Sequence, residues 1–342
     1  MKKILIVKLG AMGDVLRTTP LLLALKREHP NSHITWIVED ICAFVLEDND
    51  LIDDLWIYSK ATMDKLADFE FDLAFNLDKE PEALESITKA IAIEKKGFGA
   101  EADGVTPRAL TPSSNYALTL GVDDELKFRL NKKTYQQISY EQVDLPYEND
   151  PYLFGVNDED KQYAKDHLAK LGYDRKTPII GINTGSGERF AGKRLPAHSI
   201  IELAKRLHKK HNSIILLLGG PTEAQINIDL AESLKGIAIN AGTNHSIQQF
   251  AGLVDACGII ITGDTIAMHI AIAMQTKLLV FFGSTCPAEI ELYGLGQKII
   301  SDLDCAPCYK KTCPIDEKCM SDFLMEDFES KVDQILVHHP NL

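Results

Sequence analysis

The sequence predicts an α/β protein built from two domains, each with a parallel sheet covered by helices on both faces. Almost wholly apolar runs alternate with amphipathic segments along the chain, as buried strands alternate with helices in parallel sheets. This alternation stops near residues 145–157 and then starts again. The length of 342 residues also suits two domains better than one.

The composition is that of an ordinary globular protein with an acidic surface. Hydrophobic residues make up 45% of the chain and charged residues 25%. Lys plus Arg total 36 against 50 for Asp plus Glu, and the resulting charge of −14 argues against nucleic-acid binding. No apolar run approaches the ~20 residues that span a bilayer. The run Ile4–Leu9 is too short for a signal peptide and is broken by Lys8, so we expect a cytoplasmic protein.

The first domain is expected over residues 1–155. The apolar run Ile4–Leu9 reads as a buried strand, Gly10 begins a tight turn, and Asp14 caps an amphipathic helix that runs to about Glu28. Open α/β sheets hold ligands at the carboxyl ends of their strands, so this turn is a candidate site. The further elements expected are strands at His33–Val38, Asp54–Tyr58 and Asp72–Leu77, helices at Cys42–Glu47, Met63–Asp68, Glu80–Ile91 and Thr134–Val143, and a turn at Gly97–Gly99.

The second domain is expected over residues 156–320, where the alternation repeats. Residues 321–342 are expected to form a C-terminal helix that packs back on the first domain. Two such series predict two Rossmann-like domains with a cleft between them. The elements expected are strands at Pro178–Asn183, Ser213–Leu218, Gly258–Thr262 and Lys277–Phe282, and helices at Asp158–Leu171, Ala197–His211, Glu223–Leu234, Ile247–Ala256, Thr265–Met274 and Ser321–Val337.

Two polar or glycine-rich loops follow strands of the second domain. Thr184 and Gly185 begin a flexible polar loop. Gly219 and Gly220 precede Glu223, which is placed to accept hydrogen bonds from ribose hydroxyls. Each loop alone is unremarkable in an α/β protein, but together with the next one they predict a nucleotide or phosphosugar site.

A third strand ends at Gly263 and leads into a helix. Asp264 and Thr265 stand at its N-terminus, where backbone amides can bind phosphate, and His269 lies one turn further on. The alternative is a structural turn with a core histidine. Lys193, just before another helix, can neutralise a leaving phosphate, or it is a solvated surface lysine.

These segments together resemble glycosyltransferase family 9, the lipopolysaccharide heptosyltransferases, over most of the chain. Ile4–Pro20 is similar to the family's opening strand and its Gly-Asp-Val turn. Gly263–Ile270 resembles the family's Asp-Thr-Gly-x-x-His motif, although Ile266 stands where the family has glycine. Lys193–Pro196, Gly219–Pro221 and residues 282–287 correspond to its Lys-x-x-Pro, Gly-x-Pro and Gly-x-Thr-x-Pro motifs.

The resemblance implies a GT-B fold and an inverting, metal-independent transfer of heptose from ADP-heptose to the lipid-linked oligosaccharide acceptor of the lipopolysaccharide inner core. It implies that Asp14 is the general base, that Lys193 assists the leaving diphosphate, and that Asp264, Thr265 and His269 bind the nucleotide sugar. It implies no cofactor for catalysis. Such an acceptor would bring the protein into peripheral contact with the cytoplasmic face of the inner membrane.

The chemistry itself asks for the same kinds of group. Displacement at an anomeric carbon needs a base for the acceptor hydroxyl and positive or dipolar groups where charge grows on the leaving diphosphate. Asp14 can be that base, or it can be only a helix cap. Gly13, Arg17 and Lys79 are assigned to the acceptor side, although Arg17 is equally typical of an exposed helix position.

Four of the seven cysteines fall within fifteen residues, at Cys305, Cys308, Cys313 and Cys319. Disulfides are improbable in a reducing cytoplasm, whereas four thiolates at this spacing can hold Zn²⁺ or iron tetrahedrally. Such an ion would be structural. The alternative is a set of reduced cysteines in a loop.

Two other functions stay open beside ADP-heptose transfer. One is a related transferase that uses another nucleotide sugar or a protein acceptor. The other is a non-catalytic protein that binds a nucleotide sugar, against which Asp14 and Lys193 argue.

Overall fold

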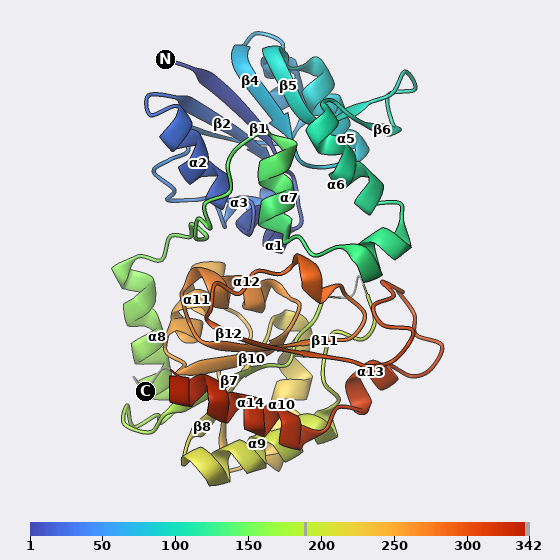
Figure 1. Ribbon diagram of the computed structural model, residues 1–342. Coiled ribbons are helices and arrows are strands. Elements are labelled where there is room, and N and C mark those ends of the chain that lie inside the picture. Colours follow the sequence, from blue (N-terminus) through green and yellow to red (C-terminus); the bar gives the residue numbers. More distant parts are fainter. Residues whose placement is uncertain (188–189, 339–342) are drawn as a thin grey trace. The chain divides into compact units, whose positions relative to one another are not determined.

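The computed structural model describes residues 1–187 and 190–338, and the chain divides into two compact units (Figure 1). Unit 1 comprises Met1–Gly155 with Ala288–Glu291, and unit 2 comprises Val156–Pro287 with Leu292–Leu342. Each unit contains a sheet with helices around it, so the predicted α/β class with two parallel-sheet domains is confirmed.

The sheet of unit 1 has six strands in the order β3-β2-β1-β4-β5-β6. Its neighbouring strands pair in parallel except β5 and β6, which are antiparallel. The strands are β1 (Lys3–Val7), β2 (His33–Val38), β3 (Asp54–Ile57), β4 (Glu70–Asn76), β5 (Ile91–Ala100) and β6 (Pro107–Ala109). This is the doubly wound order of dinucleotide-binding proteins, in which the chain changes direction across the sheet between β1 and β4.

The sheet of unit 2 has the order β12-β11-β10-β7-β8-β9, with parallel pairing throughout. The strands are β7 (Ile179–Asn183), β8 (Ile214–Leu218), β9 (Ala238–Asn240), β10 (Ile259–Gly263), β11 (Leu278–Phe282) and β12 (Gly296–Ile300). Counted from its own first strand, unit 2 has the same strand order as unit 1. Its direction therefore changes between β7 and β10.

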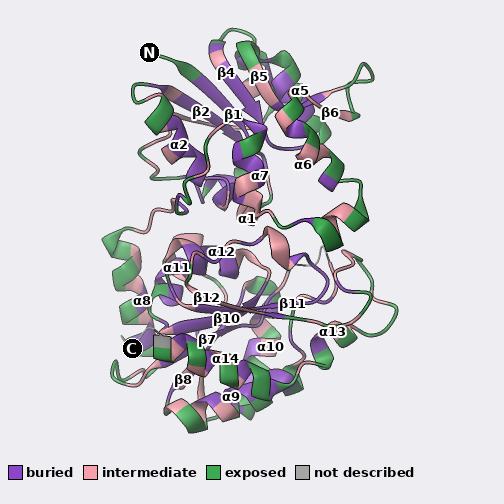
Figure 2. Ribbon diagram, viewed as in Figure 1, coloured by how far each residue is buried: buried purple, intermediate pink, exposed green. Residues whose placement is uncertain are grey.

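Most helices of both units cover the sheets with one face and leave the other face exposed (Figure 2), whereas α12 has no exposed residue. In unit 1 they are α1 (Met12–Leu16), α2 (Pro20–Glu28), α3 (Asp40–Ala43), α4 (Lys60–Leu66), α5 (Pro81–Lys89), α6 (Asn115–Leu120) and α7 (Tyr135–Gln142). In unit 2 they are α8 (Asp158–Lys170), α9 (Ala197–His211), α10 (Ala224–Ser233), α11 (Ile247–Asp255), α12 (Ile266–Ala273), α13 (Lys318–Ser321) and α14 (Met325–His338).

The single helix expected after the first turn is two helices. It starts at Met12 rather than after Asp14, and it stops at Leu16. A second helix begins at Pro20, which has no N–H to continue the first helix and suits a first helical position. Asp14 therefore lies in the first turn of α1 and is not its cap, because Ala11 is.

The region after α5 contains more structure than its sequence pattern predicts. The expected turn at Gly97–Gly99 is wrong, because these residues lie inside strand β5. Gly97 has a φ of +88° and pairs with Asn76 of β4, where a Cβ atom would overlap the Asn76 carbonyl oxygen. Glycine is thus needed for a close approach of two strands. Helix α6 and strand β6 also fall in the stretch where only α7 was expected.

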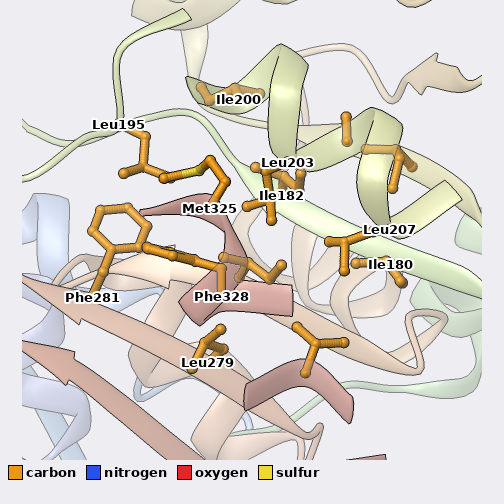
Figure 3. Packing of buried hydrophobic residues seen from close by; sticks show 14 of the residues in the cluster. Ile180, Ile182, Leu195, Ile200, Leu203, Leu207, Leu279, Phe281, Met325 and Phe328 are labelled. Atoms are coloured by element: carbon orange, nitrogen blue, oxygen red, sulfur yellow. The ribbon is translucent and has the colours of Figure 1, made fainter. Parts of the chain in front are cut away.

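The C-terminal helix α14 packs into unit 2. Its apolar side chains Met325, Phe328, Val332 and Ile335 are buried among residues of α9 and of the unit 2 sheet (Figure 3). The expectation that this helix packs back on the first domain is therefore wrong. Four apolar positions along one helix face need a core to cover them, and the sheet of unit 2 supplies it.

Among the described residues, no helix combines the length and the apolar character that crossing a membrane requires.

Candidate functional site

In each unit a group of the predicted site residues lies at the point where the strand order changes direction. In unit 1, Asp14 follows β1 and Lys79 follows β4, and these two strands pair side by side. In unit 2, Thr184 follows β7 and Asp264 follows β10, which also pair. Ligands of open α/β sheets bind outside the carboxyl ends of such strand pairs.

The loop between β1 and α1 is held by a buried ion pair. Lys8 and Asp78 are 3% and 6% exposed, and the ammonium of Lys8 bonds the carboxylate of Asp78. The same carboxylate accepts a hydrogen bond from Leu9 N at 2.6 Å, and Lys8 Nζ donates to the carbonyl of Gly10 at 2.9 Å. Burial alone would lower the pKa of Lys8, but the charge of Asp78, together with Tyr135, Asp14 and the hydrogen bond to Asp78, outweighs burial and raises that pKa. The loop is thereby tied to the end of β4.

Asp14 is paired with Arg17 on the same helical turn. Arg17 Nη2 lies 2.7 Å from Asp14 Oδ1, and about a third of the Asp14 side chain remains exposed. The guanidinium of Arg17 lies 3.7 Å from the centre of the Tyr135 ring in α7. Gly13 precedes Asp14 within α1. Gly13, Asp14 and Arg17, which the sequence assigned to this site, are thus neighbours. The Arg17 side chain is mostly buried, so the alternative of an exposed helix arginine does not apply.

Lys79 begins the segment after β4 and is half-buried. Its Nζ donates to the carbonyl of Ala117 at 3.3 Å and lies 5.0 Å from the Phe98 ring. Burial, and after it the charge of Lys127, lowers the pKa of Lys79. A lysine in this state gains from a nearby anion, as its assignment to an acceptor site requires.

In unit 2, the side chain of Asn183 joins the ends of β7 and β10. Its Nδ2 donates to the carbonyl of Gly185 at 2.8 Å, to Thr262 Oγ1 at 3.2 Å and to Thr265 Oγ1 at 3.3 Å. Thr184 Oγ1 lies 2.6 Å from Asn227 Oδ1 and 3.0 Å from the carbonyl oxygen of Leu218, two acceptors for its one hydroxyl proton. The loops after these strands are therefore held together by polar side chains.

Glu223 closes its own turn at the end of β8. The side chain is 7% exposed, and its carboxylate accepts from Gly220 N at 3.0 Å and from Thr222 Oγ1 at 2.9 Å. Cβ atoms on Gly185 and Gly219 would approach Glu223 to 2.7 Å and 2.8 Å, so glycines are needed on both sides of it. A carboxylate has further lone pairs, which leaves capacity for a ribose hydroxyl.

Lys193 and Asp264 are brought together although they are far apart in sequence. Lys193 Nζ lies 4.0 Å from Asp264 Oδ2, and both side chains are about one-fifth exposed. Gly263 makes this approach possible, because a Cβ atom there would overlap the Lys193 carbonyl oxygen. Thr265 is the N-cap of α12, and His269, 5% exposed, lies one turn further along that helix. A lysine and a helix N-terminus thus stand together, as binding of a diphosphate requires.

The four clustered cysteines lie in the segment between β12 and α14. That segment bonds the loop after β11, through Cys308 N and Tyr309 N to the Ser284 carbonyl, each at 2.9 Å. It also bonds the loop before Lys193, where Glu317 Oε2 accepts from Gly192 N at 2.9 Å. In the described part of the chain, no three His, Cys, Asp or Glu side chains are arranged to hold a metal ion, and the thiols are free.

Several residues of these sites were missed in the sequence. Lys8 interrupts an apolar strand, Asp78 follows another strand, and Asn183 ends a third, so each carried a polarity signal. Tyr135 carried none, because its helix lies more than a hundred residues from Asp14.

Comparison with a family model gives a match to glycosyltransferase family 9 (heptosyltransferase) over residues 122–319, more than half of the chain. Among curated proteins, a lipooligosaccharide heptosyltransferase 2 from Campylobacter jejuni is 27% identical over 163 residues, which cover 46% of this chain and 51% of that protein. The chain thus spans about half the length of the curated relatives that it matches first.

Solved structures match over nearly the whole chain. A family 9 glycosyltransferase from Veillonella parvula has a TM-score of 0.78 at 20% identity, with 98% of both chains covered. The ADP-heptose lipopolysaccharide heptosyltransferase II of E. coli has a TM-score of 0.70 at 18% identity, with 99% of both chains covered. At these identities the likeness concerns the fold, which is the expected GT-B arrangement of two Rossmann-like domains.

Proposed function

The chain belongs to glycosyltransferase family 9, and from this premise we propose that it transfers heptose from ADP-heptose to an acceptor of the lipopolysaccharide inner core. The observation that carries the proposal is the group at the ends of β7 and β10. There Lys193 lies beside Asp264, at the N-terminus of α12. This group offers a charge and a helix dipole to a nucleoside diphosphate.

The proposed reaction is a direct displacement that inverts the anomeric carbon. Asp14 accepts the proton of the acceptor hydroxyl, whose oxygen bonds to the anomeric carbon as the bond to the β-phosphate oxygen breaks. ADP leaves with the bonding electrons. Lys193 and the first amides of α12 stabilise the charge that grows on it, and His269 adds a donor. No metal ion or cofactor is needed for these steps.

The donor site is proposed to hold ADP-heptose along the ends of the unit 2 strands. Asp264, Thr265 and His269 contact the phosphates, Glu223 binds ribose, and the loops at Thr184–Gly185 and Gly219–Gly220 admit the nucleotide. Thermal-shift titration with ADP-, UDP- and GDP-sugars tests this. ADP-heptose is expected to give the largest rise in melting temperature, and a clear preference for another donor would replace heptose as the transferred sugar.

The base assignment has its own test. Asp14→Ala should reduce transfer to a low residual rate while leaving the thermal shift with ADP-heptose intact, because Asp14 lies in unit 1 and the proposed donor site in unit 2. Full transfer by Asp14→Ala would show that another group takes the proton. A protein that binds the donor but transfers nothing, even in its natural form, would be the non-catalytic alternative.

The acceptor is proposed to be the anionic, lipid-linked oligosaccharide, bound at the loop of Gly13 and at Lys79. The half-buried ammonium of Lys79, with its lowered pKa, gains from an anionic partner. Such an acceptor lies in the inner membrane, so we place the protein in the cytoplasm with peripheral contact at that membrane. Transfer to isolated inner core, compared with transfer to a peptide acceptor, separates this proposal from a protein-modifying transferase.

For the cysteine segment we propose a structural Zn²⁺ or iron ion at Cys305, Cys308, Cys313 and Cys319. What supports it is their spacing and the fact that the pKa of Cys319 is raised to about 11 by burial and by the other three thiols, so all four lie in one neighbourhood. Binding requires the loop to draw the thiols together. Elemental analysis of freshly purified protein decides. About one equivalent of metal supports the site, and less than a small fraction of one rules it out.

A further inference from the structure

We propose that Arg17 is a positioning residue that holds the Asp14 carboxylate for proton transfer, and that α7 is the template that fixes Arg17. This inference rests on the proposed function of Asp14. It replaces the sequence-based assignment of Arg17 to the acceptor, because the arginine contacts Asp14 rather than pointing into open solvent.

The contacts of Arg17 are directed inward. Its side chain is 13% exposed, and Nη2 bonds Asp14 Oδ1 at 2.7 Å. The flat face of the guanidinium covers the Tyr135 ring at 3.7 Å. Asp14, by contrast, keeps about a third of its side chain exposed. A substrate can therefore reach the carboxylate more easily than it can reach the arginine.

Helix α7 fixes both the side chain and the backbone of Arg17. The Tyr135 hydroxyl is hydrogen-bonded to Thr18 Oγ1 at 2.9 Å, which holds the ring that Arg17 covers. Gln136, 1% exposed, donates from Nε2 to the Arg17 carbonyl at 3.3 Å and to the Tyr152 hydroxyl at 3.1 Å. Arginine suits this position because its planar group can stack and bond a carboxylate at once, which a lysine cannot do.

The consequence for catalysis is twofold. The arginine restricts the rotation of the Asp14 side chain, and small misplacements of a reacting group cost large factors in rate. Its positive charge also favours the ionised carboxylate, which is the form that accepts a proton. Neither effect needs Arg17 to touch the acceptor, so its loss should lower kcat and leave KM for the acceptor nearly unchanged.

The test is kinetic, on the full chain. Arg17→Met should lower kcat about 10- to 100-fold, with acceptor KM within about twofold. The acidic limb of its pH–rate profile should move to higher pH. Arg17→Lys should restore the position of that limb but only part of kcat. Tyr135→Ala should resemble Arg17→Met. Tyr135→Phe, which keeps the ring but loses the hydrogen bond to Thr18, should fall between Tyr135→Ala and the wild type. The exposed control Arg108→Met should match the wild type. A raised acceptor KM with an unchanged kcat in Arg17→Met would overturn the proposal.

A double-mutant cycle separates this proposal from the proposed function. If Arg17 acts through Asp14, then Arg17→Met should have no further effect in an Asp14→Ala background. Additive losses would mean that Arg17 works independently of Asp14, and would overturn the positioning role while Asp14 stays the base. Full activity of Asp14→Ala alone would instead overturn the base assignment itself. The thermal shift with ADP, expected to be unchanged in every variant, confirms that each remains folded.

Discussion

The buried ion pair between Lys8 and Asp78 holds the loop that leads to Asp14. Its contribution to the stability of the protein can be tested directly. Lys8→Met leaves the Asp78 carboxylate buried without its cation, which should lower the free energy of unfolding by about 3–5 kcal/mol. The double variant Lys8→Met/Asp78→Leu should recover part of that loss. Urea denaturation measures both, with Lys3→Met at the exposed start of β1 as the control. A Lys8→Met protein as stable as the wild type would contradict this role.

A second residue-level prediction concerns His245 of unit 2. The Tyr163 hydroxyl lies 2.9 Å from its Nδ1, and its Nε2 donates to the Ala241 carbonyl at 2.9 Å, so both ring nitrogens have partners in the folded protein. Burial lowers the pKa of His245 below its ordinary value of about 6.5. The hydrogen bond to Ala241 acts in the opposite direction, and the charge of His167 lowers the pKa further. The unfolded chain therefore binds more protons, and stability is complete above about pH 6.5 and falls as the pH drops below it.

Denaturation curves at about pH 7.5 and about pH 5.5 measure this loss. His245→Gln should lose less stability between the two values than the wild type does, because no proton can bind at that position. His198→Gln, at an exposed site in α9, is the matched control and should behave as the wild type. An identical pH dependence in all three proteins would refute the prediction.

What the sequence could predict about single residues depended on local pattern. Asp14, Lys193 and Asp264 could be singled out as candidates because each follows or precedes an element at a recognisable spacing. The pairing of Lys193 with Asp264 needed the fold, since it joins two loops separated by the strands β8 and β9. The contact between Arg17 and Tyr135 could be predicted least of all. Tyr135 lies in a stretch without clear periodicity, where no local sequence signal indicates that it packs near α1.

Among the helices and strands, the packing of α14 gives the clearest prediction about stability. Phe328 is fully buried against Phe281 of β11, with ring centres 6.0 Å apart (Figure 3). Phe328→Ala should lower the free energy of unfolding by about 3–5 kcal/mol, because the transfer energy of the ring is lost and a cavity remains. Arg206→Ala removes ion pairs between α9 and Glu326 and Glu329 of α14, but these lie near the surface.

Surface ion pairs contribute about 1 kcal/mol or less, so Arg206→Ala should cost far less than Phe328→Ala. The same urea denaturation series compares the two. If the arginine variant were the less stable one, charge rather than burial would hold α14 to unit 2.

Helices and strands could be predicted where burial gives the sequence one clear hydrophobic pattern. They were harder to predict where charged residues or a glycine interrupt that pattern. The buried strands β1, β7, β8, β10 and β11 are predominantly apolar runs, and the structure has a strand at each. Strand β5 was missed because its first half is partly exposed and contains Glu94 and Lys95, while its glycine at Gly97 reads as a turn. That glycine is required by the neighbouring strand, a relation that only the paired sheet reveals.

At the scale of the whole molecule, the two units share one strand order without a recognisable repeat in sequence. The order follows from general rules for right-handed crossovers and short connections, which many different apolar sequences satisfy. This is why the number and class of the domains could be predicted while the strand order could not. The shared order places each candidate site at the same topological position, with the proposed base in one unit and the proposed diphosphate site in the other.

If the donor site lies in unit 2 and the acceptor site in unit 1, a bound nucleotide should protect the backbone of unit 2 from hydrogen exchange. ADP at a concentration well above its Kd should slow exchange in the loops 183–187, 219–223 and 263–269, because ligand binding adds its free energy to local opening. The loop 8–17 of unit 1 should change less, since we propose that it binds the acceptor and not the nucleotide. Lys193→Ala should weaken the protection in unit 2 by lowering the affinity for the diphosphate, whereas Asp14→Ala should leave it unchanged. Protection by ADP centred on residues 8–17 would mean that the nucleotide binds in unit 1, and the roles of the two units would have to be exchanged.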